Sequence, residues 1–294
     1  MAMAVLLLSV HLARKKNRYS PFTEKLLRSP GYTLGQKLDD FSTRVLEVYL
    51  RIAFPPILLL FLHDRLSQFG YFFLLALMAL YMGFNVRKMV RLLGEVKKIR
   101  LGLDGEVYTG QELNYLMRQG AWVFHDIPYQ YGNIDHLVVS KGGVFVVETK
   151  TVRKPADEDG KRQSTVAVVD GWLQFPHQPS QAPIQQAKRH AEHVRKYLEK
   201  KTGKIYPVTP VVALPGWFVK TEKATDCLVI NPKRGGGLRS FVERQVIPDN
   251  ETQIIANHIE GFARTVQSNA DINDPDARKN FDFWLNRKPE QEKM

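Results

Sequence analysis

The sequence predicts an α/β domain with a mixed sheet, preceded by a helical hairpin that spans a membrane. Three observations support this prediction. The 18-residue stretch Phe69–Val86 carries no charge. Basic residues concentrate around it, because residues 1–100 hold 16 Lys and Arg against 6 Asp and Glu, whereas residues 101–294 hold 26 against 24. Beyond residue 100, short β-branched runs alternate with helical patterns, which is typical of α/β proteins.

Composition excludes several classes of protein. The chain has 294 residues, of which 44% are hydrophobic and 24% are charged, so it is not intrinsically disordered. Its length suffices for one large core with additional segments. The single cysteine, Cys227, excludes an internal disulfide framework and a cysteine-rich zinc site. A reducing compartment is therefore expected.

Two apolar stretches form the predicted hairpin. Phe69–Val86 reaches the lower length limit for a helix that crosses about 30 Å of hydrocarbon. Val45–Leu62 is equally long, but it carries two charges near its start and the pair Pro55-Pro56, which should kink or break a helix. Only residues 63–68 connect the two stretches, which favours a hairpin. The alternatives are a soluble pair of buried helices and a re-entrant first segment.

Flanking charge predicts the topology of this hairpin. Eight Lys and Arg residues precede the first stretch and six follow the second, whereas the connection holds only Arg65. Such cations favour the cytoplasmic side. We therefore expect a basic cytoplasmic segment at 1–44, a two-helix membrane anchor at 45–86 and a basic linker at 87–100. The expected location is a bacterial inner membrane, with both termini and the following domain in the cytoplasm.

The α/β domain is expected at residues 101–266. It should follow a junction at Gly94–Leu103 and begin with a helix from Asp104 to about Gln119. Strands are predicted at Ala121–Asp126, Ile134–Ser140, Val144–Thr151, Thr165–Asp170, Val208–Leu214 and Leu228–Ile230. Helices are predicted at Pro183–Lys201, where the proline stands at a tolerated position, and at Asn250–Val266. Residues 267–294 are expected to form a polar tail.

The two strands around Lys141-Gly142-Gly143 form a predicted β-hairpin that gathers charged residues. If Lys141-Gly142 is the turn, Asp135 lies opposite Glu148. If Gly142-Gly143 is the turn, Asp135 lies opposite Lys150 instead. Either turn places two carboxylates and one ammonium group on one face, because strand residues alternate between faces and opposed residues have Cβ atoms about 5 Å apart.

Such a group of charges suits phosphodiester hydrolysis. The two carboxylates, Asp135 and Glu148, repel each other, and their apolar neighbours keep them partly dry. Lys150 compensates in part, and a divalent metal would supply the remainder. Mg²⁺ (or Mn²⁺) prefers one or two carboxylates together with waters and phosphate oxygens. Lys150 would orient the attacking water or stabilise the transition state. The alternative is a structural ion pair at a strand end.

Two strings, Gly132–Val139 (GNIDHLVV) and Gly143–Lys150 (GVFVVETK), resemble the nuclease-related domain (NERD) family, which belongs to the restriction-endonuclease-like PD-(D/E)xK group. Gly105-Glu106 matches the family's Gly-Glu pair on a preceding helix. Pro183–Ala187 matches the start of a later helix, with Gln186 as the aligned glutamine, although Ala182 stands where the family often has asparagine. The resemblance runs from about Gly102 to about Leu214.

This resemblance implies a restriction-endonuclease-like mixed sheet flanked by helices. It also implies that Asp135 and Glu148 are metal ligands, that Lys150 is the catalytic lysine, that Glu106 is an auxiliary acid and that Gln186 faces the site. The expected function is that of a membrane-anchored, Mg²⁺-dependent (or Mn²⁺-dependent) nuclease, with DNA favoured over RNA. The alternative is a non-catalytic nucleic-acid-binding or scaffold module of the same fold at the membrane.

The helix at Pro183–Lys201 is predicted to bind nucleic-acid phosphates. Residues 141–244 carry 19 Lys and Arg against 10 Asp and Glu. The expected phosphate contacts are Lys188, Arg189, Arg195 and Lys196, with a merely solvated helix face as the alternative. His190 and His193 lie on the same helix and are expected at its surface rather than as a zinc-binding pair.

Overall fold

The computed structural model describes residues 25–129, 132–155, 163–222 and 225–265. Most of the expected N-terminal segment and the whole of the polar tail, 267–294, lie outside the described residues. Ser29–Ala263 form one compact unit, and the description below concerns this unit.

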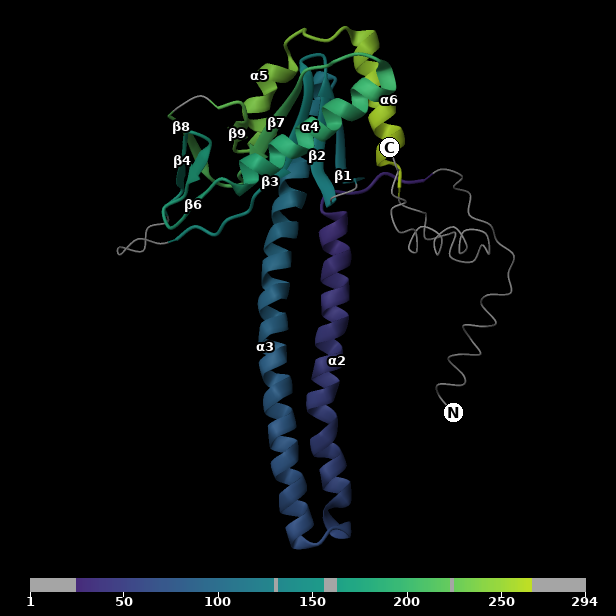
Figure 1. Ribbon diagram of the computed structural model, residues 1–294, viewed down its shortest axis with the longest axis vertical. Coiled ribbons are helices and arrows are strands. Elements are labelled where there is room, and N and C mark those ends of the chain that lie inside the picture. Colours follow the sequence, from purple (N-terminus) through teal and green to yellow (C-terminus); the bar gives the residue numbers. More distant parts are fainter. Residues whose placement is uncertain (1–24, 130–131, 156–162, 223–224, 266–294) are drawn as a thin grey trace, which may run out of the picture. The chain divides into compact units, whose positions relative to one another are not determined.

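Two long helices follow each other in the chain and lie side by side (Figure 1). Helix α2 spans Tyr32–Leu62, and helix α3 spans Gln68–Leu113. A 3-10 turn, His63–Arg65, connects them. Ser67 caps α3, because its hydroxyl accepts a hydrogen bond from the backbone N–H of Gly70 at 3.3 Å. Helix α2 continues through its proline pair, so the expected break does not occur.

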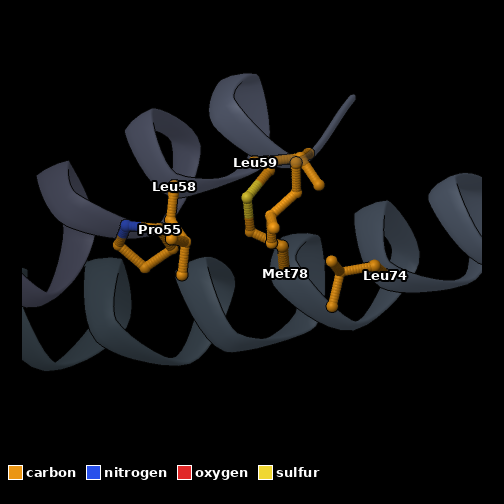
Figure 2. A pocket seen from close by; sticks show the side chains of 6 residues that line it. Pro55, Leu58, Leu59, Leu74 and Met78 are labelled. Atoms are coloured by element: carbon orange, nitrogen blue, oxygen red, sulfur yellow. The ribbon is translucent and has the colours of Figure 1, made fainter. Parts of the chain in front are cut away.

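Both helices are long and apolar enough to cross a membrane. Only 11% of the most apolar window of α2 and 6% of that of α3 is buried. Phe61, Phe69 and Leu80 are each at least 74% exposed. A soluble helical pair would bury such side chains. Where the helices meet, they form a small apolar pocket (Figure 2), lined by Pro55, Leu58, Leu59, Leu62, Leu74 and Met78.

Helix α3 runs without interruption from its apolar part into the α/β domain. The expected junction at Gly94–Leu103 is therefore wrong, and the expected helix start at Asp104 is wrong as well. Residues 87–100, predicted as a linker, are helical. Each of the two glycines, Gly94 and Gly102, costs a helix only about 1 kcal/mol relative to alanine, and the Leu, Lys, Arg and Glu residues between them favour helix.

The main sheet has five strands in the order β1-β2-β3-β7-β9. Strands β1, β2 and β3 pair antiparallel, whereas β3, β7 and β9 pair parallel, which confirms the predicted mixed sheet. Their bounds are Trp122–Tyr129, Gly132–Ser140, Gly143–Thr149, Val208–Ala213 and Leu228–Ile230.

A second mixed sheet has the order β6-β5-β4-β8. The sequence predicted only β4 of these strands and predicted no separate sheet for it. The other three strands have two to four residues each, too few for a recognisable alternation. In the order of the sheet, the bounds are Pro179–Ser180, Trp172–Gln174, Thr165–Val169 and Phe218–Thr221.

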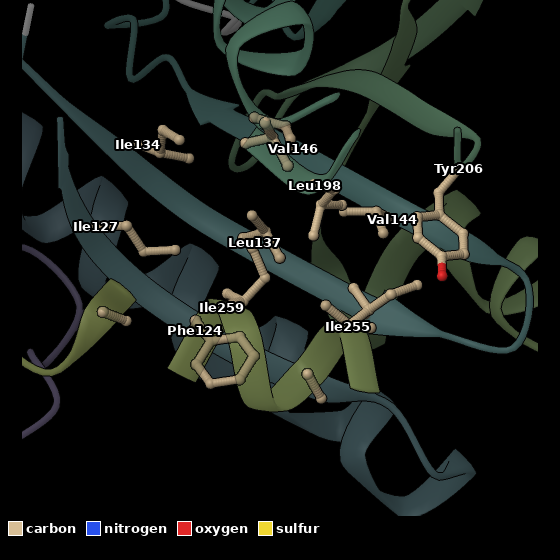
Figure 3. Close-up of a cluster of buried hydrophobic side chains, with 14 of the residues drawn as sticks. Phe124, Ile127, Ile134, Leu137, Val144, Val146, Leu198, Tyr206, Ile255 and Ile259 are labelled. Carbon is tan, nitrogen blue, oxygen red and sulfur yellow. The ribbon is translucent and has the colours of Figure 1, made fainter. Parts of the chain in front are cut away.

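Helices cover both faces of the main sheet. On one face, α4 (Ala182–Thr202) and α6 (Asp249–Ala263) pack against Leu137, Val144 and their neighbours (Figure 3). On the other face, the end of α3 packs together with the 3-10 helices Asn114–Gln119 and Lys233–Leu238 and with α5 (Arg239–Val242). The β2–β3 hairpin therefore lies between two helical layers.

Candidate active site

The turn between β2 and β3 decides which residues face each other. Ser140 pairs with Gly143, so Lys141-Gly142 is the two-residue turn, which is the first of the two alternatives. A Cβ atom on Gly142 would lie 1.8 Å from the carbonyl oxygen of Phe241, so this close packing requires glycine. Continued by one step beyond its last pair, this register places Asp135 opposite Glu148.

Asp135 and Glu148 are buried, with 6% and 7% of their surfaces exposed. The backbone N–H of Thr149 donates a hydrogen bond to Oδ2 of Asp135 at 2.8 Å. Burial and the nearby charge of Glu148 nevertheless raise the pKa of Asp135 above its usual value. Burial raises the pKa of Glu148 to about 7, although the positive charges of Lys150 and Arg189 oppose the rise.

Glu106, on helix α3, lies close to Asp135 and Glu148. A Cβ atom on Gly105 would lie 1.6 Å from Oγ1 of Thr151, so the glycine lets α3 approach the chain that leaves β3. Glu106 is 8% exposed. Burial and the charges of Asp135, Asp126 and Glu148 raise its pKa to about 9. Three predicted carboxylates therefore share one buried region.

The remaining predicted residues surround Glu148. Gln186, on α4, donates a side-chain hydrogen bond to the Glu148 carboxylate. Lys150 is exposed just beyond β3, and its backbone N–H donates to the carbonyl oxygen of Ala213 at 2.9 Å. The Lys150 ammonium lies close enough to oppose the rise in the pKa of both Asp135 and Glu148. The structure thus brings together all five residues predicted for the reaction centre.

The donor set fits a hard divalent cation. Oε2 of Glu106 and Oε2 of Glu148 are buried and have no hydrogen-bond partner in the described part of the chain. A cation would offset the burial that raises all three carboxyl pKa values, and also the repulsion that adds to the rise for Asp135 and Glu106. Within the described residues, no three His, Cys, Asp or Glu side chains are arranged to hold a metal together. Mg²⁺ suits such a site better than zinc, because it accepts one or two carboxylates and takes its other ligands from water and phosphate.

His190 contradicts its expected place on the surface. It is 3% exposed, and its Nδ1 lies 3.3 Å from Oε2 of Glu148. Burial, and secondarily the charge of Arg189, lowers its pKa to about 4, so the imidazole is neutral. A sequence signal existed, because His190 belongs to the buried stripe of α4 that includes Ala187, Ala191 and Val194.

Asp126 is a fourth buried acid among the described residues, and the sequence pattern did not indicate it. It lies in β1 at the register position opposite Asp135 and has a left-handed backbone with φ 47°. Its carboxylate accepts hydrogen bonds from Thr33 of α2 at 2.7 Å and from Asn133 of β2 at 2.8 Å. The first turn of α2 is thereby tied to the strands that carry the carboxylates.

The predicted phosphate-binding residues differ in their surroundings. Lys188 pairs with Asp226 at 2.5 Å, and both Arg195 and Lys196 pair with Glu192. Such exposed pairs contribute little to stability. Arg189 is exposed, and its charge opposes the rise in the pKa of Glu148, so it lies next to the carboxylates.

Comparison with known proteins gives one family. Residues 101–215 match the family model described as "Nuclease-related domain" (NERD). The matched range begins at the end of α3 and includes β1 to β7 and α4. It therefore contains all five residues predicted for the reaction centre. Searches of curated proteins and of solved structures found no match.

Proposed function

Because residues 101–215 match the nuclease-related domain family, we propose that the protein is a divalent-metal-dependent nuclease held at a membrane, with DNA as its substrate. The observation that supports this most directly is the convergence of Glu106, Asp135 and Glu148 from three different elements into one buried region beside Lys150. Buried carboxylates that raise each other's pKa are unfavourable for a purely structural core.

Each residue has a role that follows from its place. Asp135 and Glu148 would hold the cation, with Gln186 steadying Glu148. A bound Mg²⁺ or Mn²⁺ would lower the pKa of a water and stabilise charge on the phosphoryl group. Lys150, at the exposed margin, would orient the attacking water or contact a phosphate oxygen. Glu106 would accept or hold a proton near that water as an auxiliary acid.

Nucleic acid would approach along α4. Arg189, on α4, is near enough for its charge to oppose the rise in the pKa of Glu148, and Lys188, Arg195 and Lys196 extend positive charge along the same helix. Such contacts to phosphates give affinity without sequence specificity. The mixture of close cations and buried acids supports cleavage of a polyanionic backbone.

The membrane part of the proposal concerns α2 and α3. Their exposed apolar side chains would face lipid, and the cations at 87–100 would remain on the cytoplasmic side. Reporter fusions at Asp64 and at the C-terminus test this topology. We expect the C-terminal reporter to be active in the cytoplasm and the Asp64 reporter to be active on the opposite side, and the reverse pattern would refute the proposed orientation.

The activity should be tested on the full chain in detergent or nanodiscs. A fragment that begins near residue 95 would cut α3 and remove the hydrogen bond from Thr33 to Asp126. The substrates are supercoiled, linear and single-stranded DNA and RNA, each with Mg²⁺, Mn²⁺ or EDTA. We expect metal-dependent cleavage that is lost in Asp135→Ala and Lys150→Ala. Glu95→Gln, at an exposed position of α3, is the matched control and should cleave like the wild type.

The outcome also decides between the two functions. Cleavage that survives in Asp135→Ala would place the activity elsewhere or in a contaminant. Retained DNA binding by the folded wild type without cleavage of any substrate would favour the non-catalytic binding or scaffold module.

A further inference from the structure

We propose that His190 is a positioning residue of this nuclease, which holds the Glu148 carboxylate in the orientation that binds the metal. This inference rests on the proposed function. It concerns a residue outside the five for which the sequence predicts a role at the reaction centre. The inference depends on the place of His190 in α4, on its contact with Glu148 and on the neighbours that fix its ring.

His190 occupies a position where an apolar residue would be expected. Its companions in the buried stripe of α4 are Ile184, Ala187, Ala191, Val194 and Leu198. An imidazole in such a stripe loses its water contacts, which is unfavourable unless a partner replaces them. The structure offers one polar partner at close range, the carboxylate of Glu148.

The contact is made by two atoms that are otherwise unpartnered. Nδ1 of His190 and Oε2 of Glu148 lie 3.3 Å apart, and neither atom makes a hydrogen bond within the described residues, so the pair is a close polar contact. Because an ionised carboxylate only accepts hydrogen bonds, a hydrogen bond between these two atoms would require the proton of the neutral imidazole on Nδ1. Catalytic hydrogen bonds are often long or poorly aligned before ligands bind, and we infer that this contact becomes a hydrogen bond once the site binds its metal.

The imidazole is itself held in place. The ring of Tyr129, from β1, packs edge-on against it with 5.1 Å between ring centroids. Gln186 lies one helical turn earlier on α4 and donates to the same carboxylate. Two residues four apart on one helix therefore both contact Glu148 from the same side. Carboxylates that bind metals commonly need such partners, and loss of one lowers metal affinity or activity by about 10- to 100-fold.

The test compares three substitutions at His190. In asparagine the amide nitrogen stands two bonds from Cβ, like Nδ1 of histidine, so His190→Asn retains a donor in place. In His190→Gln the donor lies one bond farther out, and His190→Leu has none. His193→Leu is the matched control, because His193 also contacts the ring of Tyr129 but has no contact with Glu148.

Two quantities are measured on the full chain in detergent. The first is the Kd for Mn²⁺ alone, from the electron paramagnetic resonance signal of free Mn²⁺. The second is the Mg²⁺ concentration that gives half-maximal cleavage of linear DNA. We expect both to rise about 10- to 100-fold in His190→Leu and His190→Gln, as for lost partners of metal ligands. For His190→Asn, which keeps a donor at the same place, we expect both quantities to stay within about threefold of the wild-type values. For His193→Leu, which removes no contact with Glu148, we expect both to be unchanged.

The outcomes separate this inference from the proposed function. If the wild type binds Mn²⁺ and cleaves DNA but His190→Leu behaves identically, the inference is wrong and the nuclease proposal stands. If His190→Asn and His190→Leu weaken Mn²⁺ binding equally, His190 contributes only to packing, and the positioning role is wrong. If the wild type neither binds Mn²⁺ nor cleaves, both proposals fail. Thermal unfolding of each variant verifies that it is folded.

Discussion

Glu106→Gln should make the protein more stable and less active at the same time. Burial raises the pKa of Glu106 to about 9 in the folded state, whereas the unfolded chain has the ordinary pKa of 4.5. Between these two values the unfolded chain binds fewer protons than the folded chain. Stability of the metal-free protein therefore falls as pH rises through this window, and it is highest below a pH of about 4.5 as far as Glu106 is concerned.

The size of this effect follows from the shift. Each pH unit above the ordinary pKa of 4.5 corresponds to about 1.4 kcal/mol, so at pH 7 burying Glu106 costs of the order of 3 kcal/mol. Glutamine removes the ionisation but keeps the shape. Its amide must still find partners in place of an unpaired Oε2, so we expect a net gain of about 1–3 kcal/mol at pH 7.

The assay is thermal unfolding of the full chain in detergent with EDTA at pH 5, 7 and 9, followed by the fluorescence of the buried Trp217. Glu106→Gln should flatten the fall in stability between pH 5 and 9, and it should lower Mg²⁺-dependent cleavage. Glu95→Gln, an exposed position on the same helix, should leave the pH dependence unchanged. A Glu106→Gln protein that is less stable than the wild type at pH 9, or that shows the wild-type pH dependence, would refute the reasoning.

Two further predictions concern packing and substrate binding. Gly105→Ala should lower the free energy of unfolding by about 1–3 kcal/mol, because its Cβ would overlap Thr151, whereas Gly94→Ala on the same helix, with no heavy atom within 4 Å of the new Cβ, should raise it by up to about 1 kcal/mol. Chemical unfolding measures both, and equal effects would contradict the close approach of α3. Arg189→Ala should weaken DNA binding and reduce the salt-dependence slope by about 1. Lys196→Ala, which also loses an ion pair to Glu192, should have a smaller effect in fluorescence anisotropy, and a larger effect would place the phosphate path farther along α4.

The sequence predicted those parts of the fold that have a local signal. The β2–β3 hairpin was predictable because Lys141-Gly142-Gly143 separates two apolar runs, and the remaining question was the choice of turn. The choice between the two turns depends on how Gly142 packs against Phe241. Phe241 lies about 100 residues away in the chain, so no local sequence pattern indicates this contact. Strands β5, β6 and β8 were missed because two to four residues form a strand only through their partners.

The site was predicted less completely, for similar reasons. His190 is predicted at the surface as the alternative to a zinc-binding pair with His193, although its spacing from Ala187 and Val194 places it in the buried stripe. The left-handed backbone of Asp126 has no sequence signature, since this conformation is uncommon outside glycine. The continuity of α3 was missed because Gly94 and the change in composition resembled a boundary.

The unbroken course of α3 has a mechanical consequence. Glu106 lies 20 residues beyond Val86, so helical rise alone places it about 30 Å along the axis from the end of the apolar stretch. The helix also fixes an angular phase, since each residue inserted between them would turn Glu106 by about 100° relative to the hairpin. Under the proposed function, cleavage would be confined to nucleic acid that comes within this reach of the bilayer. Because α3 is continuous between the hairpin and Glu106, a rotation or tilt of the hairpin in the lipid would also move the Glu106 carboxylate.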